Sequence, residues 1–243
     1  MTAAPSAVDL LRMWETGDGL TPPEQALIAL GASLPDATRR ELARISVGER
    51  AARLLALRQA LSGPHMNCLV LCPECGQSLE FHESAHDLLD DYHQPDRREF
   101  EIEIDEVIVT FRLLTSDDLI AVSDHLDVEA ARMALIGRCV LSATTVDGDP
   151  VDSLSAEAIA DLGEALEARD PLSNIAIALR CDNCGHVWRA GFDIMVFLWA
   201  EIVRRAKATL QDVRVLAKRY GWSETDILTM SAARRAFYLE DGA

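Results

Sequence analysis

Two short stretches, Cys72-Pro-Glu-Cys-Gly76 and Cys181-Asp-Asn-Cys-Gly185, decide how this chain can fold. A Cys-x-x-Cys turn places two thiolates on the same side of a tight loop, and the glycine after the second cysteine lets backbone amides face the sulfurs. Two such turns supply four soft ligands, the set that a structural zinc site uses, and leave no coordination position open for water. We therefore expect one non-catalytic, structural Zn²⁺ held by Cys72, Cys75, Cys181 and Cys184.

The separation of the two turns is unusual for a single zinc site. Residues 76 to 180 lie between them, whereas the two cysteine pairs of a compact zinc ribbon are about 15 to 20 residues apart. Three alternatives therefore stay open: a metal-free pair of turns, a redox-active pair and an iron–sulfur site. The redox alternative lacks the βαβ context of a thioredoxin-like motif, and the apolar stretches beside both turns favour a shared zinc.

These flanking stretches predict a β-hairpin around each cysteine pair. Asn67 to Leu71 and Ser78 to His82 flank the first pair, and Asn174 to Arg180 and His186 to Phe192 flank the second. Helices and hairpins alternate without regular βα units, so we expect an α+β fold with a zinc-ribbon-like core. The expected segments are a helical N-terminal lobe (1–64), a first zinc-knuckle hairpin (65–85), an acidic insert (86–172), a second zinc-knuckle hairpin (173–193) and a C-terminal helical segment (194–243).

Capping signals place the helices. Thr21-Pro-Pro-Glu24 and Ser46-Val-Gly-Glu49 begin two helices of the N-terminal lobe, and Gly63-Pro64 ends the second. The insert should hold a hairpin and then three helices, at Thr115 to about His125, Val128 to Ala143 and Ser155 to Arg169. The segment 86–98 is expected to be a loop with one helical turn. A long amphipathic helix from Phe197 to Tyr220, closed by Gly221, should precede two short helices that begin after serines.

The charge of the chain argues against nucleic acid as a partner. The 243 residues include 23 basic and 40 acidic side chains, for a formal net charge of -17, which repels phosphate. Between Glu74 and Glu129 there are seventeen acids and three bases. This segment is expected to be a solvated acidic surface, with a site for a basic partner as the alternative. No apolar run is long enough for a membrane span or a signal peptide, so we expect a cytoplasmic protein.

The remaining candidate residues have simpler explanations. Cys68 and Cys139 lie among apolar neighbours and should be buried thiols. His186 could hydrogen-bond near the sulfurs or pack within its strand. The adjacent acids Asp117 and Asp118 fit a helix cap better than a catalytic pair. The sequence has no phosphate-binding loop, nucleophile elbow or metalloprotease motif, so no enzyme activity is predicted.

Several segments together resemble the baseplate hub assembly chaperone family of T-even-like phages, which is also found with extracellular contractile injection systems. The resemblance covers most of the chain. It rests on LLRMWETG (10–17), PPEQALIAL (22–30), CPECG (72–76), RLLTSDDL (112–119), CDNCGHVWRAGFDIMVFLWAEI (181–202) and YGWSETDILTMSAARRAFYLE (220–240).

The resemblance implies a non-catalytic protein that helps baseplate or hub subunits of a contractile phage tail fold or assemble, and that either leaves or joins the finished particle. Such a protein needs an exposed interaction surface. The candidate residues for it, which suit a core equally well, are Trp199, Trp222, Arg234, Arg235, Phe237 and Tyr238.

Two other functions stay open. A zinc-ribbon regulator of nucleic acid would need a basic face, and one cluster offers it: Arg204, Arg205, Lys207, Arg214, Lys218 and Arg219. An injected effector or an unrecognised enzyme would need a catalytic constellation, which the sequence does not show.

Overall fold

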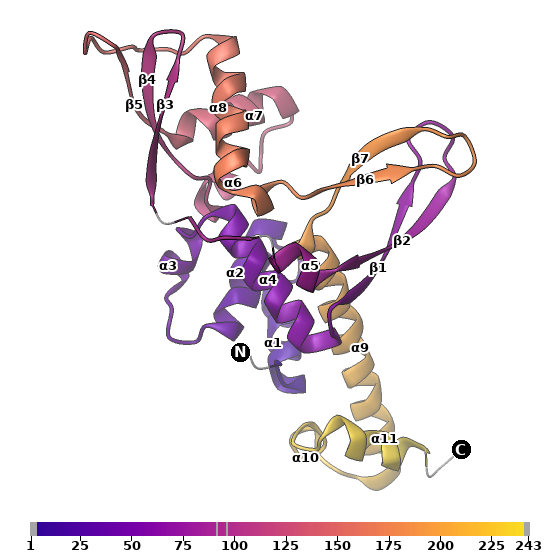
Figure 1. The fold of residues 1–243 in the computed structure, drawn as a ribbon. Coiled ribbons are helices and arrows are strands. Elements are labelled where there is room, and N and C mark those ends of the chain that lie inside the picture. Colours follow the sequence, from indigo (N-terminus) through magenta and orange to yellow (C-terminus); the bar gives the residue numbers. More distant parts are fainter. Residues whose placement is uncertain (1–3, 91, 96, 241–243) are drawn as a thin grey trace.

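The computed structural model describes residues 4–90, 92–95 and 97–240 and is α+β, as expected (Figure 1). Its N-terminal lobe is helical. Thr21 and Glu24 form the capping box that begins α2, with prolines in the first turn. Ser46 caps α4 through the backbone N–H of Glu49. The helices of this lobe are α1 (Ala7–Gly17), α2 (Pro22–Ser33), α3 (Arg39–Ala43) and α4 (Val47–Ser62).

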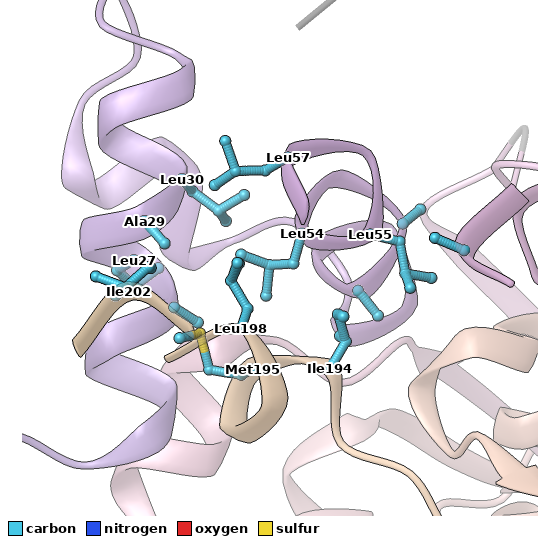
Figure 2. Packing of buried hydrophobic residues seen from close by; sticks show 14 of the residues in the cluster. Leu27, Ala29, Leu30, Leu54, Leu55, Leu57, Ile194, Met195, Leu198 and Ile202 are labelled. Carbon is cyan, nitrogen blue, oxygen red and sulfur yellow. The ribbon is translucent and has the colours of Figure 1, made fainter. Parts of the chain in front are cut away.

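The long C-terminal helix α9 (Ile194–Tyr220) packs into this lobe with its first half. Apolar side chains of α2, α4 and α9 meet in the largest core of the molecule (Figure 2). Leu54, Leu198 and Ile202 are fully buried there. Residues about 140 positions apart in the sequence thus share one core, and Arg58 adds a buried ion pair with Glu201 at 3.2 Å.

Two β-hairpins leave this core as separate two-stranded antiparallel sheets. The first is formed by β1 (His65–Leu71) and β2 (Ser78–Ser84), and the second by β6 (Ala176–Arg180) and β7 (Val187–Gly191). β1 follows α4 directly, and β7 leads directly into α9. The tips of the two hairpins meet at the right of Figure 1.

Most of the segment between the hairpins, from β3 to α8, forms a second α+β unit with its own core, whereas α5 and η1 pack against the main core. Its three-stranded antiparallel sheet has the order β3-β4-β5, and Val109, Phe111 and Leu162 are fully buried between the sheet and the helices. The elements of this segment are α5 (Ala85–Asp90), β3 (Glu99–Ile104), β4 (Val107–Arg112), α6 (Ser116–Ala121), α7 (Val128–Cys139), β5 (Val140–Thr145), α8 (Ala156–Arg169) and the 3₁₀ turn η1 (Pro171–Ser173).

Two helix predictions in this segment were wrong in length. The helix expected to reach Ala143 ends at Cys139, and the chain continues as β5, which pairs with β4. Residues 140–145 are rich in β-branched side chains, and pairing with an open strand edge outweighs the helical pattern that precedes them. The helix expected to reach His125 is α6, which ends at Ala121.

The C-terminal unit is small and lies at the far end of α9 (Figure 1). Gly221 ends α9 in the left-handed conformation, and α10 (Glu224–Leu228) and α11 (Ala232–Glu240) fold back on the helix. Its buried core consists of Val213, Leu216 and Ile227. Within the described ranges, no helix combines the length and apolar character needed to cross a membrane.

Candidate metal centre

The first cysteine pair lies in the turn between β1 and β2. The backbone N–H of Cys72 donates to the carbonyl of Gln77 at 2.8 Å, and Gly76 donates to the carbonyl of Cys72 at 2.9 Å. Gly76 has a φ of 72°, a conformation that a residue with a Cβ rarely adopts. The glycine therefore lets the chain reverse within the turn while both thiols stay on one side.

The second pair repeats this turn between β6 and β7. Cys181 donates to the carbonyl of His186 at 2.9 Å, and Gly185 donates to the carbonyl of Cys181 at 2.8 Å. Gly185 has a φ of 76°. Because both turns have the same hydrogen bonds at the same spacing, they present equivalent pairs of sulfurs to each other.

The four sulfurs form one cluster. All of them lie within 4.8 Å of one another, and the cysteines are free thiols. The Sγ atoms of Cys72 and Cys184 are 3.7 Å apart, and those of Cys75 and Cys181 are 3.6 Å apart. A tetrahedral ion with metal–sulfur bonds of about 2.3 Å separates its ligands by about 3.8 Å. The cluster therefore has the dimensions of a four-coordinate metal site, and the four predicted ligands are the residues that the fold brings together.

The cluster is half sheltered. Cys72 and Cys181, the first cysteine of each turn, are buried, whereas Cys75 and Cys184 are exposed. The side-chain amide of Asn183 donates to the sulfur of Cys75 at 3.6 Å. The sequence analysis did not predict this contact. The signal for it is the position of Asn183, a polar residue directly before Cys184. Such a donor stabilises the thiolate form of its acceptor.

The pKa values of two clustered thiols, Cys75 and Cys184, are shifted in opposite directions. The backbone N–H of Gln77 and then the amide of Asn183 lower the pKa of Cys75 to about 6. For Cys184 the backbone N–H of His186 lowers the pKa, but desolvation and the other three sulfurs outweigh it and raise the value to about 12. One thiolate thus disfavours the ionisation of its neighbours. A bound dication would offset this repulsion and hold all four cysteines as thiolates.

The chemistry of this donor set is structural. Four thiolates complete a tetrahedral shell, so a bound ion would have no position for substrate or water. Among the residues that the structure describes, these cysteines form the one group with the ligand geometry of a metal site. An ion there would connect two hairpins whose cysteines are 106 positions apart.

The other two cysteines and His186 lie outside the cluster of four sulfurs. Cys68 and Cys139 are buried, as predicted, and burial raises the pKa of both thiols, that of Cys139 to about 12. The imidazole of His186 stacks on Trp188, with ring centroids 5.8 Å apart. The ring of His186 thus takes the packing role, against a side chain of the strand that follows it. Its backbone carbonyl accepts from the backbone N–H of Cys181, and in the described part of the chain its imidazole makes no hydrogen bond to a sulfur.

The adjacent acids also have a structural role. Asp118 completes the capping box of α6, as predicted, by accepting from Thr115. The sequence did not reveal that the same carboxylate is buried and accepts from Arg112, at 2.7 and 2.9 Å, and from Arg138, at 2.9 Å. Asp118 thereby connects α6 to β4 and α7.

The structure divides the predicted interaction surface. Trp199 packs on the main core, where a Cβ on Gly17 would overlap its ring, and Arg235 is buried, so both take the alternative core role. Phe237 is 58% exposed. Trp222 and Tyr238 pack against each other with ring centroids 4.9 Å apart, and Arg234 is exposed beside them.

The basic cluster lies along α9. Arg205 is half-buried and donates to the carbonyl of Leu61 and to Ser62, so it holds α9 against the end of α4. The exposed members of the cluster are Arg204, Lys207, Arg214, Lys218 and Arg219.

Comparison of the chain with protein-family models, with curated proteins and with solved structures gives no match.

Proposed function

We propose that this protein is a non-catalytic assembly factor or structural component of a contractile-tail baseplate, in which Zn²⁺ joins two β-hairpins in a zinc-ribbon-like arrangement. The observation that carries the zinc part is the cluster of four cysteine sulfurs at the hairpin tips. The baseplate part rests on the resemblance of the sequence segments to the hub assembly chaperones. Both parts agree with a protein that acts by binding rather than by chemistry.

Zinc fits this cluster better than a redox function does. A redox-active Cys-x-x-Cys exchanges electrons within one pair, whereas the close contacts here, of 3.7 and 3.6 Å, join sulfurs of different hairpins. A single iron would use the same four ligands, but d¹⁰ zinc is the usual ion in structural Cys₄ sites. Metal analysis of protein purified without chelator should find about one zinc per chain, and folded protein without metal would contradict the proposal.

The hairpins also offer apolar surface for a partner. Leu69 and Leu71 of β1 are 66% and 63% exposed, and Val187 of β7 is 66% exposed. Apolar side chains on a projecting element favour protein–protein contact, and the metal would hold both hairpins in one fixed geometry for it. We propose that baseplate or hub subunits of a contractile tail are the partners and that the complex forms in the cytoplasm.

Co-expression tests this part of the proposal. The chain should co-purify with the baseplate and hub subunits encoded beside its own gene, and serine substitution of both Leu69 and Leu71 should weaken the complex. Leu126→Ser is the matched control, because this leucine is equally apolar and fully exposed but lies in the insert. Neighbouring genes without sheath, tube or baseplate proteins, or a complex that survives the double substitution, would count against it.

A further inference from the structure

A cavity of about 480 Å³ lies where the helical lobe, the insert and the second hairpin meet. Its walls come from the beginning of α4, the segment around α6, the turn η1 and the beginning of α9. This volume falls within the range of sites for small ligands. Most of the lining is apolar and includes Val47, Leu54, Leu119, Phe192, Ile194 and Met195.

One cationic side chain, Arg50, lines this largely apolar cavity, together with the acidic Asp193. Arg50 of α4 is 7% exposed, yet among the described residues its guanidinium makes a single hydrogen bond, from Nη1 to the hydroxyl of Ser116 at 3.2 Å. Its Nε has no partner there, and no carboxylate of the described chain lies within 4.0 Å. Arginines in buried positions are normally paired. Arg50 therefore retains hydrogen-bond donors for which the described chain supplies no acceptor.

Two acidic residues, Asp170 and Asp193, act through their charges to raise the pKa of Arg50, against the larger effect of burial. Each also accepts a hydrogen bond from another element, although Oδ1 of Asp170 is buried without a partner in the described part of the chain. Asp170 accepts from the backbone N–H of Gly48 at 2.7 Å through Oδ2, and Asp193 caps α9 by accepting from Met195 at 2.8 Å. Burial raises the pKa of Asp170, and burial is also the main cause that lowers the pKa of Arg50. Neither acid thus forms the ion pair that a buried guanidinium calls for.

We propose that this cavity binds a monocarboxylate with an apolar tail, the carboxylate paired with Arg50 and the tail held against the apolar wall. A planar guanidinium with free donors matches a carboxylate through two parallel hydrogen bonds. The charge of Asp193, which also lines the cavity, disfavours any anion, and it disfavours a phosphate dianion more than a monocarboxylate because a single arginine is present to offset it. The carboxylate can belong to a free organic acid or to the C-terminal residue of a polypeptide, since both present the same group.

Calorimetric titration of the full chain with 4-methylpentanoate tests the proposal, with 4-methylpentanamide as the neutral analogue of the same shape. The acid should bind saturably, and at least about tenfold more tightly than the amide, because hydrogen bonds to a charged group are lost with the charge. Arg50→Met should weaken binding of the acid by a similar factor. Arg53→Gln is the matched control, since Arg53 lies on the same helix, pairs with Glu49 and does not line the cavity.

A second variant keeps the test decisive if Arg50→Met does not fold. Ser173 lines the cavity, so Ser173→Phe reduces the volume for a ligand, leaves Arg50 in place and should also abolish binding. A peptide ending in a free leucine carboxylate, compared with its amidated form, distinguishes the two sources. Tighter binding of the peptide assigns a polypeptide C-terminus, and tighter binding of the small acid assigns a free organic acid.

Three results would overturn the proposal: equal affinity for the acid and the amide, unchanged binding by both variants, or no saturable binding of the acid or the peptide. None of these readouts depends on zinc or on baseplate subunits.

Discussion

Replacement of Cys181 by serine should remove the metal and destabilise the whole chain. Cys181 is completely buried at the centre of the cluster, and a hydroxyl is a poor substitute for a thiolate ligand of zinc. The remaining three sulfurs would hold the ion weakly, so the connection between the hairpins would be lost. No chemical reaction should be affected, because the proposed ion has no open position.

Two limiting cases give the size of the effect. If the ion stays on the unfolded chain, it closes a loop of 106 positions, and loop-closure entropy makes this worth about 4.7 kcal/mol for roughly 100 residues. If the ion leaves on unfolding, its contribution follows mass action and is about 4.1 kcal/mol at a free zinc concentration 1,000 times Kd. Both cases predict a loss of about 4 kcal/mol, which lowers the melting temperature of a chain of this size by about 8 to 16 °C.

The assay combines urea unfolding, followed by the fluorescence of tryptophans such as Trp188 beside the site, with metal analysis of the same samples. Cys68→Ser is the matched control, because Cys68 is a buried cysteine on β1 of the first hairpin and lies outside the cysteine cluster. It should keep its zinc and lose about 1 to 2 kcal/mol. A Cys181→Ser protein with wild-type melting behaviour would refute the structural role, and so would an equal loss in both variants.

Three further predictions concern other parts of the molecule. Asp118→Asn should cost about 3 kcal/mol above pH 4, because it breaks a buried ion pair. Burial acts to raise the pKa of Asp118, but its arginine and threonine partners outweigh burial and hold the pKa down to about 2. This stability is therefore present above the usual value of 3.8 and is lost as the pH falls through about 2. Urea midpoints of the variant at several pH values should converge with those of wild type on acidification, and a difference that stays constant would contradict the assignment. Gly17→Ala should cost about 1 to 3 kcal/mol by overlap with the Trp199 ring, whereas Gly31→Ala, whose new methyl group meets only Leu42 at 3.9 Å, should be neutral or stabilising in thermal unfolding. Excess chelator at neutral pH should reproduce the instability of Cys181→Ser and leave that variant itself unchanged, and a chelator effect of equal size on both proteins would show that the metal acts elsewhere.

The sequence predicted best where the signals are local. The cap residues Thr21 and Ser46 placed helix starts within one residue, and Gly221 placed the end of α9. The four clustered cysteines were predictable because each turn needs a cysteine pair and a glycine at fixed spacing. These features depend on neighbours in the sequence, so no knowledge of tertiary structure was required.

Features that depend on distant contacts were not predictable in this way. Residues 140–145 became a strand because β4 offers them an edge to pair with, and nothing within the segment itself reveals that edge. The same holds for Arg50, whose cavity is assembled from four separate segments. A charged residue near the start of an amphipathic helix is normally exposed to solvent. Only the folded structure shows that Arg50 is buried.

A metal ion at the cysteine cluster would stabilise a part of the fold that has no core of its own. A two-stranded hairpin is marginal by itself, and each of these hairpins belongs to a separate sheet. At its base β1 is anchored by the buried residues Met66 and Cys68, and β7 is anchored by its direct continuation into α9. The tips have no such core, and a metal ion there would close a ring that runs from α4 through both hairpins to α9 and back through the core that these two helices share. The shared core would close this ring at the base of the hairpins and the metal ion would close it at their tips. The exposed apolar side chains of both hairpins would then be held in one arrangement, which reduces the conformational entropy lost when a partner binds.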